Sequence, residues 1–338
     1  MMFRKFLQLS ILSALILSIS ACGGVEKEKV RKENTLTPQT IRDSRQNMRD
    51  FIQDISAYAK GIKYNFIVIP QNGHDLLTEN GEETGTSAML YMDAIDGVGR
   101  EDIFYGYDDD DITTPVSERD LMISFMDIAE SNDVEVLTTD YCSNVSFIDD
   151  SYSQNAARGY ISFAADHREL DNIPVYPQKP FNMNFTDVTS LFEAKNFLYL
   201  LNSSSYPNKE NFLNAIKNTH YDVLIIDAFY DSDILRSDDV ATLQTKPNGV
   251  SRLVIAYMSI GEAEDYRYYW QNSWTSNPPS WLEKENPNWY GNYKVRYWDS
   301  AWQDIIYGND TSYLRKILDA GFDGVYLDII DAFEYFES

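Results

Sequence analysis

Two carboxylates near the end of the chain follow a short apolar run and are the first residues with evident chemical use. Val325, Tyr326 and Leu327 form that run, Asp328 ends it, and Asp331 follows three residues later. Branched and aromatic residues favour a strand, and an acid at its carboxyl end is typical of the catalytic strands of a parallel barrel. Carboxylates in such a position can transfer protons, attack an electrophilic carbon or bind a cation.

The same pattern recurs along the chain, because eight apolar runs each end on or near a polar or acidic residue. The predicted strands are Phe66–Ile69, Ala94–Tyr105, Val134–Leu137, Gly159–Ala164, Phe197–Leu201, Val223–Ile226, Leu253–Met258 and Val325–Leu327. The residues at their ends are Gln71, Glu101, Asp140, Asp166, Asn202, Asp227, Glu262 and Asp328. In a barrel the carboxyl ends of all strands face one rim, so these side chains are expected to converge there. Asp and Asn also cap helices, which is the alternative for each one singly.

Helical periodicity separates several of these strands. The predicted helices are Ile41–Lys60, Ser117–Asn132, Asn208–Asn218, Asp238–Thr245 and Ser312–Ala320. Strands that alternate with helices indicate a parallel α/β fold, and eight strands predict a single (β/α)8 TIM barrel over residues 41–338. A truncated two-domain protein is the alternative, and the presence of all eight strands argues against it.

The composition limits the partners. The 338 residues carry a formal net charge of −25, which argues against nucleic acid and anionic membrane surfaces. The acidity favours a cationic ligand, although it also keeps a secreted protein soluble. His74, His167 and His220 are far apart, and the chain has no glycine-rich phosphate loop, so neither a metal nor a cofactor is expected.

Residues 1–21 have the pattern of a bacterial lipoprotein signal peptide. A basic start precedes the apolar segment Phe6–Ser18, and Ile19–Cys22 resembles a lipobox in which Cys22 is acylated. Residues 22–40 are polar and predict a flexible tether. The expected location is therefore extracytoplasmic, with the lipid as the only contact to the bacterial membrane. An uncleaved anchor helix is the alternative, for which the apolar segment is short.

Five segments together resemble glycoside hydrolase family 114. They are LVIAYMSIGEAEDYRYYW, GVYLDIIDAFEYF, FIVIPQNG, AIDGVGREDIFY and VLTTDY. The resemblance implies a TIM barrel with endo-α-1,4-polygalactosaminidase activity. In that family the YMSIGE and GVYLD strands precede the PQNG strand, whereas here they follow it. The resemblance therefore implies a circularly permuted strand order.

The permutation makes three parts of the chain correspond to parts of the family. Residues 41–170 would be the family's C-terminal half, and residues 191–338 its N-terminal half. The connector 171–190, which holds three prolines, would join the former termini; barrel termini lie close together, so such a cut is tolerable. The helix Ile41–Lys60 should then pack behind the strand that ends at Asp328.

The resemblance also implies a pair of carboxyl groups for cleavage of a glycosidic bond. One protonates the leaving oxygen, and the other attacks or stabilises the cation-like sugar carbon. Matching of the motifs assigns Asp328 as the nucleophile or charge stabiliser and Glu101 as the acid/base. The alternative for both is a structural role as a cap or an ion-pair partner.

Further residues are expected to contact the substrate around this pair. They are Asp227, Glu262, Asp331, Asp140, Gln71, Tyr257, Tyr141 and Trp270. The carboxylates would pair with the ammonium groups of a galactosamine polymer, and the tyrosines would stack on it or donate hydrogen bonds to it. All six tryptophans follow Glu262 in a long insert, where they either form a small core or stack on sugar rings.

The sequence thus predicts a lipid-anchored, monomeric glycoside hydrolase that cuts an α-linked amino-sugar polysaccharide, without cofactor, metal or nucleic acid. A non-catalytic glycan-binding protein on the same barrel is the alternative, and a structural envelope protein is a third interpretation. The enzyme alone depends on Asp328 and Glu101.

Overall fold

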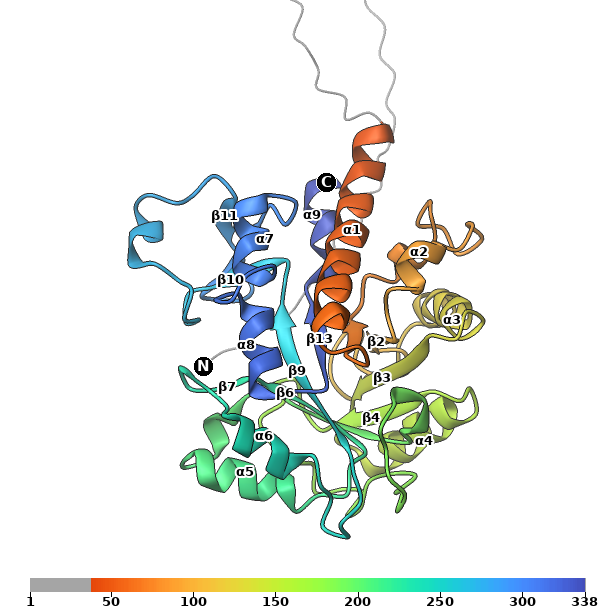
Figure 1. Cartoon of the computed structure of the whole chain (residues 1–338). Coiled ribbons are helices and arrows are strands. Elements are labelled where there is room, and N and C mark those ends of the chain that lie inside the picture. Colours follow the sequence, from red (N-terminus) through yellow and green to blue (C-terminus); the bar gives the residue numbers. More distant parts are fainter. Residues whose placement is uncertain (1–37, 338) are drawn as a thin grey trace, which may run out of the picture.

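The computed structural model describes residues 38–337, which form an α/β fold with parallel sheets (Figure 1). The predicted signal peptide, Cys22 and nearly all of the predicted tether lie outside the described residues. Within residues 38–337, no helix is both long enough and apolar enough to cross a membrane.

Five parallel strands form the larger sheet, in the order β1-β13-β9-β6-β5. Their bounds are Ile67–Pro70 (β1), Gly324–Asp328 (β13), Leu253–Ser259 (β9), Val223–Asp227 (β6) and Phe197–Leu200 (β5). Nearly every residue in them is buried, as expected for parallel strands that are covered on both faces. The predicted strands are confirmed here to within one residue at each end.

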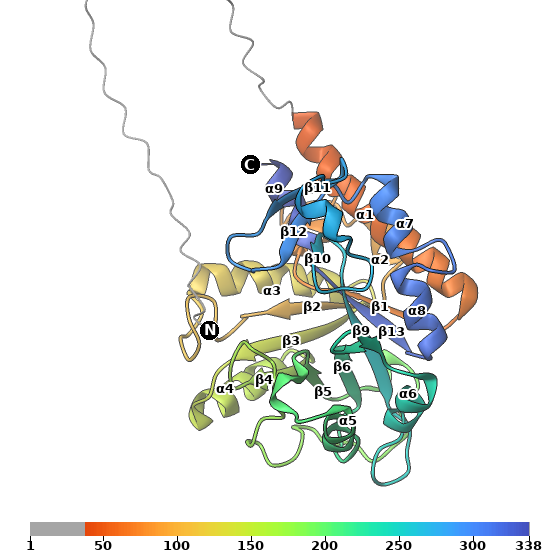
Figure 2. The same cartoon turned by 90° about the vertical axis from the view of Figure 1, so that its left-hand side faces the viewer.

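A second sheet contains β2 (Gly97–Glu101), β3 (Glu135–Tyr141) and β4 (Ile161–Ala165), which are also parallel. An isolated parallel bridge between Gln71 and Gly99 connects it to β1. On its other side, β4 lies next to β5 without a ladder of hydrogen bonds, and the rings of Phe163 and Phe197 are 5.7 Å apart. Figure 2 shows the strands of both sheets following one another in this series.

The first and last strands of the described chain are neighbours. β1 pairs with β13 in parallel register, from Ile67 opposite Gly324 to Pro70 opposite Leu327. The long helix α1 (Pro38–Ile62) packs against α8 (Tyr313–Ala320) and α9 (Phe333–Glu337), the helices that precede and follow β13 (Figure 1). The two ends of the described chain therefore complete one hydrophobic core.

The remaining elements cover the sheets or connect them. They are α2 (Met89–Met92), α3 (Val116–Glu130), α4 (Val145–Ala156), α5 (Lys209–Lys217), α6 (Ser237–Leu243), α7 (Ser300–Ile306), β7 (Phe229–Tyr230) and β8 (Asp233–Ile234). The predicted helices are confirmed as α1, α3, α5, α6 and α8. The sequence analysis did not predict α4, whose start is fixed by Asn144, because that side chain accepts a hydrogen bond from the Ser146 N–H.

The insert after β9 forms its own antiparallel sheet, in the order β10 (Glu262–Glu264), β12 (Asn292–Val295) and β11 (Leu282–Glu285). Four tryptophans pack in series beneath it, with successive ring centroids 5.1, 5.0 and 5.0 Å apart; they are Trp270, Trp274, Trp281 and Trp302. Of the two alternatives, these four tryptophans fit the small core, and they include Trp270, which was expected to contact substrate. Trp289 and Trp298 are 43% and 38% exposed.

Gly99 on β2 allows a close approach of Tyr326 from β13. A Cβ atom at Gly99 would lie 1.9 Å from the Tyr326 hydroxyl oxygen, and Tyr326 is fully buried and has no room to retreat. We expect Gly99→Ala to lower the free energy of unfolding by about 1–3 kcal/mol, as overpacking does. Urea unfolding measures this change. Gly61→Ala is the matched control, because nothing lies within 4 Å of a Cβ there, and it should be neutral or stabilising. Equal stability of the two variants would contradict the expectation.

Candidate functional site

The two predicted catalytic carboxylates lie at the carboxyl ends of strands from the two parallel sheets. Asp328 ends β13 and Glu101 ends β2, and β1 lies between these strands. The negative charge of Glu101 contributes to raising the pKa of Asp328. Both side chains are partly exposed. The fold therefore brings together residues that are far apart in the sequence.

Asp328 is held by two hydrogen bonds. The hydroxyl of Tyr257, on β9, donates to Oδ2 at 2.7 Å, and the Ile329 N–H donates to Oδ1 at 2.8 Å. Burial is the largest influence on this carboxyl and raises its pKa to about 7, with help from the charges of Glu101 and Asp331 and against the two hydrogen bonds. A carboxyl that titrates near neutrality is typical of a functional site.

Glu101 accepts hydrogen bonds on both of its oxygens. The Tyr141 hydroxyl donates to Oε1, and the Asn72 side chain donates to Oε2 at 3.0 Å. The side-chain oxygen of Asn72, Oδ1, in turn accepts hydrogen bonds from the Glu101 backbone N–H at 3.2 Å and from the Arg100 guanidinium at 3.1 Å. Sequence reasoning missed Asn72, although it stands beside Gln71, which was chosen instead.

Tyr257 can be tested through its bond to Asp328. In Tyr257→Phe the carboxylate loses a donor, so the pKa of Asp328 should rise further and its ionised form should become rarer at neutral pH. We expect turnover at pH 7 to fall about 10- to 100-fold, the cost of a hydrogen bond to a charged group. The acidic limb of the pH–rate profile should move to higher pH. A limb that stays in place would show that Tyr257 does not act on Asp328.

Asp140 and Gln71 have internal roles in the structure. Asp140 is fully buried, and its oxygens accept from the backbone N–H groups of Phe104 and Tyr105 and from the side chains of Ser151 and Asn155. Gln71 is 2% exposed and accepts from the Tyr199 hydroxyl at 2.8 Å. Both were expected to contact substrate, but the structure places them beneath the rim.

Asp227 and Glu262 are on the rim but have partners within the protein. Arg267 donates to Asp227 at 2.8 Å, and the same guanidinium pairs with Glu264. Glu262 is 2% exposed and accepts from the Asn286 side chain at 2.8 Å. These pairings take up much of the charge that a cationic substrate would use.

Asp331 and Trp270 have contrasting surroundings. Asp331 is partly exposed, and within the described residues its carboxylate makes no hydrogen bond or ion pair with another side chain. Burial raises its pKa, while the positive charges of Arg100 and Lys294 act in the opposite direction. Trp270 is half-buried in the insert, where its ring packs 4.8 Å from Tyr293. Among the carboxylates that were expected to contact substrate around the catalytic pair, Asp331 is therefore the one that remains available to bind it.

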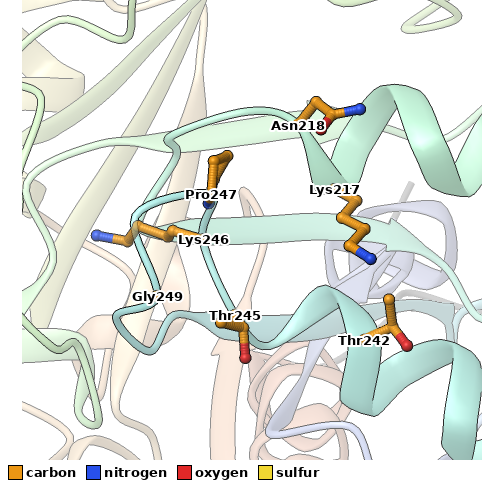
Figure 3. Close-up of a pocket in the computed structure, with 7 residues that line it drawn as sticks. All are labelled: Lys217, Asn218, Thr242, Thr245, Lys246, Pro247 and Gly249. Atoms are coloured by element: carbon orange, nitrogen blue, oxygen red, sulfur yellow. The ribbon is translucent and has the colours of Figure 1, made fainter.

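A cavity of about 420 Å³ lies on the other side of the fold, beside α5, α6 and the turn that leads into β9 (Figure 3). Its lining residues are Lys217, Asn218, Thr242, Thr245, Lys246, Pro247 and Gly249. These residues lie near the amino ends of β6 and β9, whereas Asp328 and Glu101 lie at carboxyl ends. The cavity is therefore separate from the candidate site.

The comparisons with known proteins agree with the fold over the second half of the chain. Residues 185–338 match the sequence model of glycoside hydrolase family GH114, a stretch that includes Asp328 but not Glu101. The uncharacterized protein MJ1477 of Methanocaldococcus jannaschii is 39% identical over 178 residues, 52% of this chain and 49% of that protein. An uncharacterized protein of Thermotoga maritima is 42% identical over 121 residues, 36% of each chain.

A third relative, an uncharacterized protein of Deinococcus radiodurans, is 38% identical over 122 residues, 36% of this chain and 37% of that protein. The chain therefore matches about half or less of the length of these curated relatives. Residues 185–338 thus carry the sequence features of glycoside hydrolase family GH114.

Proposed function

We propose that this protein is a glycoside hydrolase that cuts within an α-linked amino-sugar polysaccharide, as an endo-α-1,4-polygalactosaminidase does. Asp328 is the nucleophile or charge stabiliser, and Glu101 is the acid/base. The observation that carries the proposal is the placement of these two carboxyl groups at the carboxyl ends of β13 and β2, on either side of β1, where the charge of Glu101 helps to raise the pKa of Asp328. Asp328 lies inside the family match and Glu101 outside it. Each is held by the hydroxyl of its own tyrosine.

The division of labour follows from the surroundings of the two groups. Glycosidic cleavage needs one carboxyl that delivers a proton and one that meets the developing positive charge. Asp328, with a pKa of about 7, is partly protonated at neutral pH. An ammonium group on the substrate would lower that pKa, so a cationic sugar would itself favour the ionised nucleophile.

The fold proposal is a single eight-stranded barrel with a circularly permuted strand order. The Gln71–Gly99 bridge at one junction and the contact of β4 with β5 at the other support it. The pairing of β1 with β13 brings the first and last strands of the described residues together, and the family match begins at residue 185, within the proposed connector. Residues 41–170 are then the family's second half.

The residues that we propose as substrate contacts are fewer than the sequence alone suggested. Asp331 is the carboxylate that binds an ammonium group, because the other two carboxylates on the rim, Asp227 and Glu262, already have protein partners. Trp298, which is 38% exposed and packs 4.6 Å from the ring of Phe336 on the helix that follows β13, is the candidate for stacking on a sugar ring. A lipid anchor at Cys22, an extracytoplasmic location and a monomeric state complete the proposal.

Digestion of partly deacetylated galactosaminogalactan tests the activity. Wild-type protein should release reducing ends, and Glu101→Gln should release about a hundredfold fewer, since general acid catalysis contributes about 10²–10⁴-fold. Binding of the polymer should be nearly unchanged in the variant. If wild type binds the polymer and releases nothing, the protein is a glycan-binding protein; if it neither binds nor cuts the polymer, the substrate proposal is wrong.

A further inference from the structure

Arg168 lies just beyond β4 and connects three parts of the rim. Its guanidinium donates to Asp102 and to Asp110, each at 2.8 Å, and also to the carbonyl oxygen of Gly106. Asp102 directly follows Glu101 in the chain. A Cβ atom at Gly106 would lie 2.2 Å from the Asp102 carboxylate and 2.9 Å from the guanidinium, so glycine is needed for this close arrangement.

The same guanidinium lies over the ring of Tyr141. Its central carbon is 4.1 Å from the ring centroid, within the range of a cation–π interaction. Tyr141 is 2% exposed, and its hydroxyl donates to Glu101. A cation over the ring draws electron density from it, which makes the hydroxyl a stronger donor, and the contact also fixes the orientation of the ring.

We infer that Arg168 is a positioning residue for Glu101, acting through the ring of Tyr141 and through the ion pair with Asp102. The inference rests on the proposed function, in which Glu101 delivers the proton. Nothing in the sequence indicates this role, because Arg168 belongs to the loop after a different strand.

A second arginine on the rim shows why the arrangement is specific. Arg267 also joins two carboxylates, Asp227 and Glu264, and its central carbon lies 5.2, 5.4 and 5.7 Å from the ring centroids of Tyr266, Phe229 and Tyr313. The Tyr266 hydroxyl donates to Glu264, which is not one of the two candidate catalytic carboxylates. Arg168 is therefore the described arginine whose aromatic partner donates directly to a candidate catalytic carboxylate.

Loss of Arg168 should therefore slow the step in which Glu101 delivers its proton and leave the other steps unchanged. A misplaced acid slows substrates with poor leaving groups, such as a sugar polymer, far more than substrates with an activated leaving group. A displacement of about 1 Å can cost about a hundredfold in rate. Substrate binding should be little affected, because Arg168 already has two carboxylate partners within the protein.

The kinetic test uses Arg168→Gln, Arg168→Lys and Tyr141→Phe, alone and combined with Glu101→Gln. On the polymer, Arg168→Gln should lower kcat about 10- to 100-fold and leave KM within about threefold. On a 4-nitrophenyl glycoside of the same sugar, the loss of kcat in Arg168→Gln should be much smaller. When Glu101→Gln is already present, adding Arg168→Gln should cause no further loss on the polymer. Arg168→Lys, which keeps the charge, should restore part of the rate.

Arg45→Gln is the matched control. Arg45 joins Asp75 and Glu337 and lies 5.3 Å from the ring centroid of Phe333. It therefore makes the same kinds of interaction as Arg168, two ion pairs and one cation–π contact, without any contact with Glu101. It should lower thermal stability without changing the ratio of the two activities. An Arg168→Gln cost that persists in full in the Glu101→Gln background would overturn the inference.

A spectroscopic measurement separates this inference from the proposed function. In protein labelled with ¹³C at glutamate carboxyl groups, the resonance that Glu101→Gln removes should move in Arg168→Gln and in Tyr141→Phe, and not in Arg45→Gln. An unmoved resonance overturns the role of Arg168 even if Glu101 proves essential. A shifted resonance supports the role even if no hydrolysis is found. If Arg168→Gln does not fold, Arg168→Lys and Tyr141→Phe give the same decision.

Discussion

Asp328→Asn should abolish turnover and stabilise the protein, and both effects have one cause. The asparagine can neither attack a sugar carbon nor offset its positive charge, so kcat should fall by about a thousandfold or more. The same substitution removes an ionised group from a site in which burial and the charge of Glu101 oppose ionisation. A stability gain that accompanies a loss of activity is typical of a residue retained for function.

The pH dependence of this stability gain has a definite sign. The pKa of Asp328 is raised to about 7 in the folded protein from a usual value of 3.8, so the native state binds the extra proton between these values. The carboxyl therefore lowers the free energy of unfolding as pH rises from about 4 to 7. Asparagine, which resembles the protonated carboxyl, should match wild type at pH 4 and exceed it by about 1–3 kcal/mol at pH 8.

Thermal and urea unfolding at several pH values, together with reducing-end assays, measure these effects. Asp93→Asn is a suitable control, because Asp93 is an exposed carboxylate at the end of α2 and should change neither quantity. A stability difference that is the same at pH 4 and pH 8 would show that Asp328 is not perturbed. Full activity in Asp328→Asn would remove it from the mechanism.

The pair of Lys246 and Asp222 should give the largest loss of stability. Both side chains are 0% exposed, and the ammonium nitrogen is 2.5 Å from the carboxylate. The other Asp222 oxygen accepts from the Lys195 N–H at 2.8 Å, so the pair connects the segment before β5 to the turns before β6 and β9. Lys246→Met leaves a buried charge without its partner and should cost about 3–5 kcal/mol.

A double variant separates the ion pair from simple burial. Lys246→Met with Asp222→Leu removes both charges, and it should be clearly more stable than Lys246→Met alone, because neither charge is then left unpaired. Urea unfolding of the wild type and of the three variants measures the coupling. If the losses in the free energy of unfolding of the two single variants simply add in the double variant, the ion pair itself contributes nothing to stability.

The strands could be predicted from the sequence because buried parallel strands are short apolar runs bounded by turns. The strand predicted over Ala94–Tyr105 was too long, because β2 covers only Gly97–Glu101. This stretch contains two glycines and an arginine, and the structure explains Gly99 by the approach of Tyr326. The insert sheet and α4 were missed, since their exposed polar residues show no clear period. At Asn202 the helix-cap explanation is right, because its side chain accepts from the Ser204 N–H at the start of a short helical turn.

Only part of the candidate site could be predicted from the sequence. Carboxylates at strand ends could be found, since their position follows from the strand pattern. Their partners could not, because the contacts that Glu101 makes with Asn72 and Tyr141 depend on how separate strands align. For the same reason Tyr257 and Tyr141 were expected to contact substrate, whereas each donates a hydrogen bond to one of the carboxylates.

The pairing of β1 with β13 also bears on how the protein is made. β13 lies between β1 and β9, so a growing polypeptide on the ribosome presents two open sheet edges until β13 emerges. Pairing Ile67 with Gly324 closes a very long loop, and such distant pairings slow folding and leave edges that invite aggregation. The strand that carries Asp328 is thus also the one whose arrival ends that vulnerable period, so the proposed site and the closed sheet form at the same moment.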